Sequence, residues 1–276
     1  MFKDRRRSML NLNLWVPKLP KLPGQQAESS ASDTDVLRPL LRIVILNTKG
    51  GCGKSTLATN LAAYYASHDY RTALLDADPQ ASSLHWLQNR DGAHAAITAI
   101  NGTDRSLRVT RSFQMRVPPG IERLIVDTPA ALDSVRLQDM THDADAILIP
   151  VLPSDIDIHA VSRCIAELLL AGRVGQRSER VAVIANRVKK NTLVYAKLQR
   201  FLGSLGITFA ASLRDTQNYV HASEWGLGIH ELEAQGADQD ALDWEPLIQW
   251  LEQRAAQANA APDGTTAAQT VTQSPG

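Results

Sequence analysis

The sequence predicts one doubly wound α/β domain, in which a single, mostly parallel sheet is flanked by helices. From Leu41 onward, short β-rich runs alternate with longer helical patterns, which is the signature of a parallel sheet covered on both faces. Several strand runs are almost entirely apolar, as strands buried on both faces are. A glycine-rich segment follows the first of these strands and opens the first helical pattern, as in folds that bind phosphate between a strand and a helix.

The individual elements follow from these alternating patterns. The β-rich runs predict strands at residues 43–47, 72–76, 124–127, 146–151, 181–186 and 207–210. The helical patterns between and after them predict helices at residues 55–67, 82–88, 135–141, 158–171, 193–205 and 245–257. Residues 95–100 are a further candidate strand. No internal repeat interrupts this order.

The chain divides into three parts by composition. Residues 1–38 form a leader that carries Lys3 and three arginines near its start and ends in a polar linker. Residues 39–257 hold the α/β domain, and residues 258–276 form a tail rich in Ala, Thr and Gln. The leader and the tail have the composition of disordered segments. A docking role of the leader, toward a partner or an anionic membrane surface, is the alternative.

Composition sets limits on function. The 276 residues carry 29 basic and 29 acidic side chains, so any affinity for nucleic acid must come from a local patch rather than from the net charge. Two cysteines, Cys52 and Cys164, give no disulfide framework, and reduced thiols in a cytoplasmic protein are the expectation. No apolar run approaches the length of a transmembrane span.

The glycine-rich segment has the features of a phosphate-binding loop. It reads Lys49-Gly50-Gly51-Cys52-Gly53-Lys54-Ser55-Thr56. Its glycines allow the backbone to wrap around an anion, and the helix that follows adds its positive N-terminal end. Lys54 is expected to reach the β- and γ-phosphates, and the Ser55 hydroxyl is expected to bind Mg²⁺. Thr48 stands where the generic loop pattern has glycine, and a second lysine, Lys49, lies inside the loop.

Carboxylates follow two of the predicted strands. Asp76 and Asp78 come at the end of one strand, and their spacing points both side chains the same way. Asp127 ends another apolar strand. Asp127 is suited to bind Mg²⁺ through a water molecule, whereas Asp76 and Asp78 are suited to position a water molecule or a metal ion. A lone aspartate after a strand is usually a turn residue or a helix cap; beside a phosphate loop the functional interpretation is favoured.

These three motifs resemble those of one family. The segment from Lys49 to Thr56 resembles the deviant Walker A motif of the ParA/MinD family of partition and positioning ATPases. The segment from Asp76 to Gln80 is similar to the Walker A′ segment of that family, and residues 125–129 are similar to its Walker B motif. The resemblance runs in order from about Leu41 to Gly228, and its closest match is to the ParA type. It implies the P-loop NTPase fold, with ATP and Mg²⁺ as ligands.

The resemblance also implies roles for individual residues. Lys49 corresponds to the signature lysine, which reaches across an ATP-sandwich homodimer to the partner's nucleotide. Asp78, with Asp76 nearby, is expected to position the attacking water. Asn186 matches the position where the family contacts adenine, although a turn residue at a strand end is its ordinary role. The implied nucleotide-binding residues are Gly50, Gly51, Cys52, Gly53, Lys54, Ser55, Thr56, Pro153, Asp155 and Asn186.

Basic residues follow the strand that ends at Asn186. Family members that bind non-specific DNA do so with basic side chains in their C-terminal third, and Arg187, Lys189, Lys190 and Arg214 match that region. Lysine and arginine bind DNA phosphates without regard to sequence and in a salt-sensitive manner. An ordinary solvated loop is the alternative.

The function implied is a cytoplasmic, nucleoid-associated ATPase that positions or partitions a cargo. It would dimerise with ATP, bind non-specific DNA and be released when a ParB-like or other adaptor stimulates hydrolysis. The alternative is a MinD-like ATPase that cycles on membranes; its basic C-terminal amphipathic helix has no counterpart after Ala258. Cluster-carrying relatives need a CxxC pair, which the sequence lacks.

Overall fold

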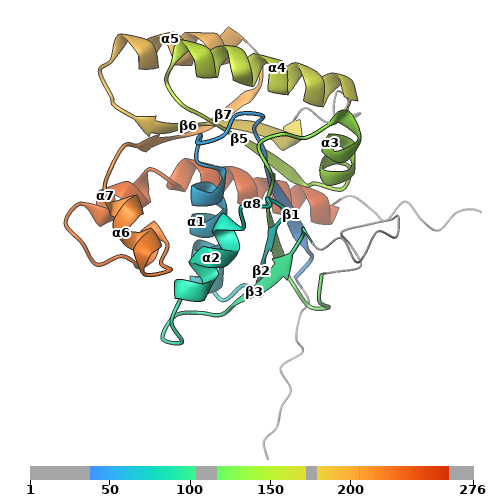
Figure 1. Cartoon of the computed structure of the whole chain (residues 1–276), viewed down its shortest axis with the longest axis vertical. Helices are drawn as coiled ribbons and strands as arrows, with labels where there is room; N and C mark the ends of the chain where they lie inside the picture. Colours follow the sequence, from blue (N-terminus) through green and yellow to red (C-terminus); the bar gives the residue numbers. More distant parts are fainter. Residues whose placement is uncertain (1–37, 104–116, 172–178, 205, 261–276) are drawn as a thin grey trace, which may run out of the picture. The chain divides into compact units, whose positions relative to one another are not determined.

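The structure contains one seven-stranded sheet, and every paired strand runs parallel to its neighbour. The structure is a computed structural model that describes residues 38–103, 117–171, 179–204 and 206–260 (Figure 1). The strands are β1 (Leu41–Ile45), β2 (Thr72–Asp76), β3 (Ile97–Asn101), β4 (Arg123–Asp127), β5 (Ala146–Val151), β6 (Val181–Val188) and β7 (Thr208–Arg214). Their order across the sheet is β3-β2-β4-β1-β5-β6-β7. The predicted doubly wound α/β class is therefore confirmed.

Helices cover both faces of this sheet (Figure 1). On one face lie α1 (Lys54–Ser67), α2 (Ser82–Asn89), α6 (Asn218–Glu224), the 3-10 turn η4 (Ile229–Glu231), α7 (Ala237–Leu242) and α8 (Glu245–Ala260). On the other lie α3 (Ser134–Thr141), α4 (Asp155–Ala171) and α5 (Leu193–Ser204). No helix in the described ranges is both long enough and apolar enough to cross a membrane.

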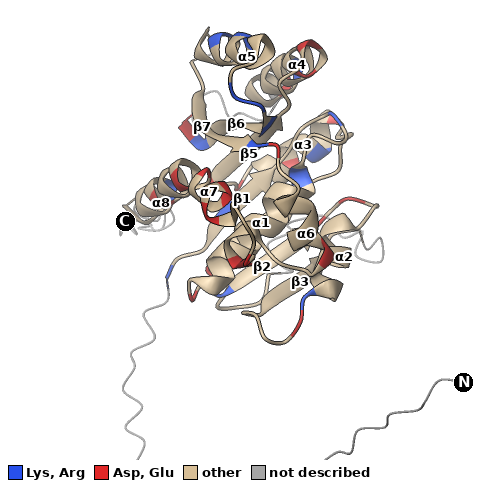
Figure 2. Cartoon of the chain, turned by 90° about the vertical axis from the view of Figure 1, so that its left-hand side faces the viewer, with Lys and Arg blue, Asp and Glu red and all other residues tan. Residues whose placement is uncertain are grey.

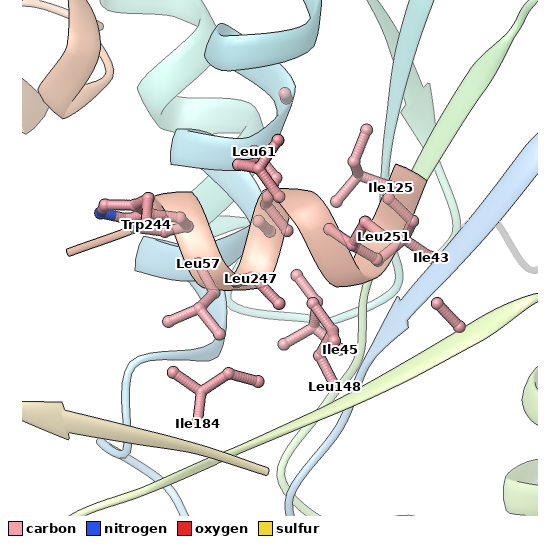
Figure 3. Packing of buried hydrophobic residues seen from close by; sticks show 14 of the residues in the cluster. Ile43, Ile45, Leu57, Leu61, Ile125, Leu148, Ile184, Trp244, Leu247 and Leu251 are labelled. Carbon is pink, nitrogen blue, oxygen red and sulfur yellow. The ribbon is translucent and has the colours of Figure 1, made fainter. Parts of the chain in front are cut away.

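Successive side chains along each strand point to opposite faces of the sheet, so they belong to two separate hydrophobic cores. Ile43 and Ile45 of β1 pack toward α1 and α8, whereas Val44 packs toward α3, α4 and α5. Figure 3 shows Leu57 of α1 and Leu247 of α8 meeting over the strands. These side chains are fully buried or nearly so, and each buried Leu or Ile stabilises the fold by about 2 kcal/mol.

The parallel register brings the carboxyl ends of the central strands to one level. Asp76 at the end of β2 pairs with Asp127 at the end of β4, and Asp127 pairs in turn with Ile45 at the end of β1. The chain leaves β1 into the glycine-rich loop only a few residues beyond this level. The three motifs found in the sequence therefore meet at one edge of the sheet.

The segment after β7 is held against α1 and α2 by buried polar contacts. Arg90, at the end of α2, forms a 2.6 Å ion pair with Glu231, and both side chains are almost fully buried. The Trp86 indole donates to the Leu227 carbonyl at 3.2 Å. On α1, the Asn60 side chain accepts the Ile229 amide at 2.6 Å. This segment therefore belongs to the same core as the phosphate loop's helix.

Several element boundaries differ from the predicted ones. The short helices α6 and α7 and the turn η4 are not predicted from the sequence, because they are too brief to establish a periodic pattern. α4 begins at Asp155 rather than at residue 158, and β7 continues to Arg214. α8 runs to Ala260, so the first three residues assigned to the tail are helical. The predicted leader up to residue 37 and the tail from residue 261 lie outside the described residues.

Candidate functional site

A pocket of about 1050 Å³ opens at the carboxyl edge of the sheet. The loop residues Gly50, Gly51, Gly53, Lys54, Ser55 and Thr56 line it. The pocket is also lined by residues that follow β2, by residues of α3 and by one residue of β6, among them Asp78, Pro79, Gln80, Arg136, Met140 and Arg187. The pocket thus brings most of the predicted phosphate loop together with Asp78 and Arg187, while the other predicted site residues do not line it.

The loop presents a free helix N-terminus to this pocket. Gly53, the residue before α1, is in the left-handed conformation with φ 97°, and no side chain caps the helix there. The first amides of α1 are therefore available to an anion, and the helix dipole favours negative charge at this end. Lys54 is almost buried, and its ammonium donates to the Lys49 carbonyl across the loop at 3.4 Å.

Asn186 fixes the loop from the neighbouring strand. Its amide nitrogen donates to the Cys52 carbonyl at 2.9 Å, and its side chain is buried. A Cβ at Gly53 would lie 2.0 Å from that nitrogen, so position 53 must be glycine both for space and for its positive φ. The predicted contact of Asn186 with adenine stays a prediction; the placement puts this residue against the loop backbone.

Asp76 and Asp127 are joined through Ser83 of α2. The Ser83 hydroxyl donates to Asp127 Oδ2 at 2.7 Å, and the Ser83 amide donates to Asp76 Oδ2 at 2.9 Å. Asp76 also accepts the amides of Leu84 and Asp78 at 3.1 and 3.0 Å. Burial raises the pKa of Asp76 despite these bonds. Asp76 therefore anchors the start of α2 and shapes the site rather than projecting into it.

Asp127 keeps one carboxylate oxygen without a partner. Its Oδ1 is buried and has no hydrogen-bond partner among the described residues. Burial is the main cause that raises the pKa of Asp127 to about 6, while the hydroxyls of Ser83 and Ser55 act in the lowering direction. An unpartnered buried carboxylate oxygen beside a serine and a phosphate loop fits Mg²⁺, which binds few carboxylates and completes its shell with phosphate oxygens and water. Ser55 and Asp127 would hold the ion, which would neutralise phosphate charge.

Lys49 is held by a residue that the sequence did not single out. Its ammonium forms a 2.7 Å ion pair with Asp157 of α4. Asp157 is nearly buried, whereas the Lys49 side chain is 35% exposed. Ser154, just before α4, bonds to the Asp157 carboxylate and accepts the Asp157 amide at 3.1 Å. The Ser-x-x-Asp spacing is a capping-box pattern, so a signal for Asp157 was present in the sequence, whereas nothing distinguishes Ser83.

Of the remaining predicted site residues, Asp78 lines the pocket, whereas Cys52, Pro153 and Asp155 do not. Asp78 lines the pocket, and its carboxylate accepts the Gln80 amide at 3.0 Å. Asp155 is exposed and forms a 2.6 Å ion pair with Lys197 of α5. Pro153 lies in the turn between β5 and α4. Cys52 is buried, and burial raises the pKa of its thiol, so the side chain acts as loop packing.

The four predicted DNA-contacting cations are in different environments. Lys189 lies 3.5 Å from Asp215, and Lys190 lies 3.8 Å from Asp243, with both lysines well exposed. Figure 2 shows this basic stretch between β6 and α5. Arg214 bonds to Asp243 at 2.8 Å and lies 3.4 Å from Asp240, so it ties β7 to α7. Arg187 lines the pocket instead.

Comparison with known proteins identifies the family. The model of the CobQ/CobB/MinD/ParA nucleotide binding domain matches residues 43–228. The chain belongs to this family. It is 31% identical over 212 residues to Maintenance of carboxysome distribution protein A of Gloeobacter kilaueensis, covering 76% of this chain and 93% of that protein. It is 28% identical over 200 residues to the protein of the same name from Halothiobacillus neapolitanus, covering 70% and 88%.

A solved structure agrees with this assignment at the level of the fold. A plasmid partition protein of Borrelia burgdorferi B31, bound to AMPPNP, superposes with a TM-score of 0.59 at 16% identity, covering 76% of this chain and 99% of that one. The family match and these relatives make the chain a nucleotide-binding protein of the ParA/MinD type.

The raised pKa of Asp127 predicts a pH-dependent stability. Between about pH 4 and the Asp127 pKa of about 6, the nucleotide-free folded state keeps a proton that the unfolded chain has released. The free energy of unfolding therefore falls as pH rises through this interval. Asp127→Asn removes the buried charge, so near neutral pH the variant should be more stable than the wild type by about 3 kcal/mol. Urea denaturation without Mg²⁺ measures this.

The gain in stability should largely disappear near pH 4, because residue 127 is then uncharged in the folded wild type and in the folded variant alike. Glu233→Gln, which neutralises an exposed carboxylate, is the matched control and should change stability little. If Asp127→Asn is less stable than the wild type at neutral pH, the charged Asp127 carboxylate does not destabilise the folded state.

Proposed function

We propose that this chain is a ParA-type ATPase that dimerises around ATP and positions a cargo on non-specific DNA. ATP would enter the pocket with its phosphates on the loop and the α1 N-terminus. Lys54 would bind the β- and γ-phosphates, and Mg²⁺ at Ser55 and Asp127 would neutralise their charge. Hydrolysis would transfer the γ-phosphoryl group to water and release ADP and phosphate.

Asp78 is the residue we propose to place the attacking water. It is the carboxylate after β2 that lines the pocket, and the bond that it accepts from Gln80 uses only one of its oxygens. Asp76 supports this role from below through its bond to the Asp78 amide. A single positioned carboxylate and the loop amides supply orientation and electrostatic stabilisation, on which phosphoryl transfer depends most.

The observation that carries the proposal is the second lysine of the loop. Lys54 is buried against the loop, so the phosphates of this subunit already have a cation. Lys49 points away from Lys54 toward the nearly buried Asp157, and its own side chain stays 35% exposed. A cation at that position can serve a nucleotide held by a facing copy, in the manner of an arginine finger supplied by a partner. To reach the nucleotide of the facing copy, Lys49 would have to break its ion pair with Asp157.

The cargo is proposed from the relatives. Both matched proteins are named for the maintenance of carboxysome distribution, which favours a protein assembly over a plasmid or chromosome region. We propose that the dimer associates with the nucleoid in the cytoplasm through Lys189 and Lys190, and that an adaptor on the cargo stimulates hydrolysis. Arg187 and Arg214 were predicted to join this DNA surface. Arg187 lines the pocket, and the Arg214 guanidinium pairs with two buried carboxylates. Both placements favour Lys189 and Lys190 as the DNA-binding pair.

Lys49→Ala should abolish the ATP-dependent dimer while nucleotide binding is retained. The side chain lost is the one proposed to cross the interface, and the loop amides and Lys54 remain. Light scattering of the full chain with Mg²⁺ and AMPPNP measures the molar mass, and fluorescence titration with a labelled nucleotide measures binding.

Lys54→Ala is the matched control, because it removes the other loop lysine and should lose nucleotide binding itself. If Lys49→Ala forms the same dimer as the wild type, the trans role of this lysine is wrong.

Lys189→Ala combined with Lys190→Ala should weaken binding to DNA of any sequence. Each lost phosphate contact should reduce the slope of log K against log salt by about 1. Fluorescence anisotropy on two unrelated duplexes at several salt concentrations measures both effects. Arg38→Gln, at the opposite edge of the sheet, removes an exposed cation and serves as the control. Unchanged affinity would return Lys189 and Lys190 to an ordinary solvated loop.

A further inference from the structure

We propose that the Arg187 guanidinium binds the nucleotide itself, at the end away from the γ-phosphate, through the α-phosphate, the ribose or the base. The inference rests on nucleotide binding in this pocket. Arg187 would then contribute to nucleotide affinity and not, with Lys189 and Lys190, to DNA binding.

The backbone at Arg187 has an unusual conformation. Arg187 has φ 51°, in the left-handed region that a non-glycine residue seldom adopts. The pairing of β6 with β7 also shifts register between Ala185 and Val188, so a bulge interrupts the strand here. Bulges next to active sites commonly redirect a side chain, and strained backbone is retained where the surrounding structure requires it. Asn186 accepts the Arg187 amide at 2.9 Å and helps to hold this conformation.

Arg187 borders the pocket and is not neutralised. Arg187 is exposed and lines the pocket together with Gly50, Gly51 and Lys54. Within the described part of the chain, its guanidinium has no carboxylate or hydrogen-bond partner. The next two cations, Lys189 and Lys190, each lie near an aspartate. A cation that is paired with nothing and borders a phosphate loop is available to a ligand.

The sheet order fixes which end of the nucleotide Arg187 meets. Asp76 and Asp127 lie on the β2 and β4 side of the loop, whereas β6 lies on the opposite side, beyond β5. If the γ-phosphate and Mg²⁺ face Asp127, the other end of the nucleotide faces β6. A guanidinium there can pair with the α-phosphate in a bidentate manner or stack on the base. Both contacts belong to one ligand class, a nucleoside di- or triphosphate.

The test compares nucleotide affinity with fold stability. Arg187→Gln should lower the affinity for Mg²⁺-bound, fluorescently labelled ADP by about tenfold, as expected for one lost charge-assisted contact. Arg187→Gly should show the same loss of affinity, while its Tm stays at or above the wild-type value because glycine tolerates φ 51°. Arg200→Gln, an equal charge change on the exposed face of α5, should bind as the wild type does.

Competition by inorganic tripolyphosphate distinguishes the two contacts. A loss in Arg187→Gln that extends to tripolyphosphate supports pairing with phosphate, and a loss confined to nucleotides supports contact with the base or ribose. Affinity of Arg187→Gln within twofold of the wild type would overturn the inference. Such a result, with DNA binding reduced, would assign Arg187 to the DNA surface. Failure of the wild type itself to bind nucleotide would instead refute the proposed function.

Discussion

The parallel register of β1, β2 and β4 is the constraint on which the site depends. It places Ile45, Asp76 and Asp127 at one level, so the loop that leaves β1 passes beside both carboxylates. Ser83 then ties Asp76 and Asp127 to the start of α2. A shift of one residue in any of these strands would turn its terminal side chain to the opposite face. The geometry of the phosphate side of the pocket is therefore built into the sheet.

The loop is fixed from the other side by contacts with β6 and α4. Asn186 bonds to the Cys52 carbonyl and packs against Gly53, and Asp157 holds Lys49. These contacts connect the nucleotide pocket to the strand that carries Arg187 and to the helix that follows β5. The DNA-binding dimer that we propose would need ATP to act on Lys49 and on the basic stretch after β6, and these contacts are the physical route that such coupling would use.

The sequence predicts the parts of this site that follow from strong local patterns. The apolar strands, the glycine-rich loop and the aspartates at strand ends are visible because each has a characteristic composition. The roles of Ser83 and Asp157 depend on which helix packs against which strand end, and that information is not local. In the sequence Arg187 belongs with Lys189 and Lys190, whereas in the structure it lies at a bulge in β6 and lines the pocket. Short elements such as α6 and α7 lack enough turns to show periodicity.

The loop that Gly53 and Asn186 preform should bind the phosphates of a nucleotide. Calorimetric titration of Mg²⁺ and AMPPNP into the full chain and into Gly53→Ala measures this binding. The wild type should bind one nucleotide per chain. Gly53→Ala would place a Cβ 2.0 Å from the Asn186 nitrogen and should bind at least about tenfold more weakly, as expected for a distorted anion site. Equal affinity of the two proteins would contradict the account.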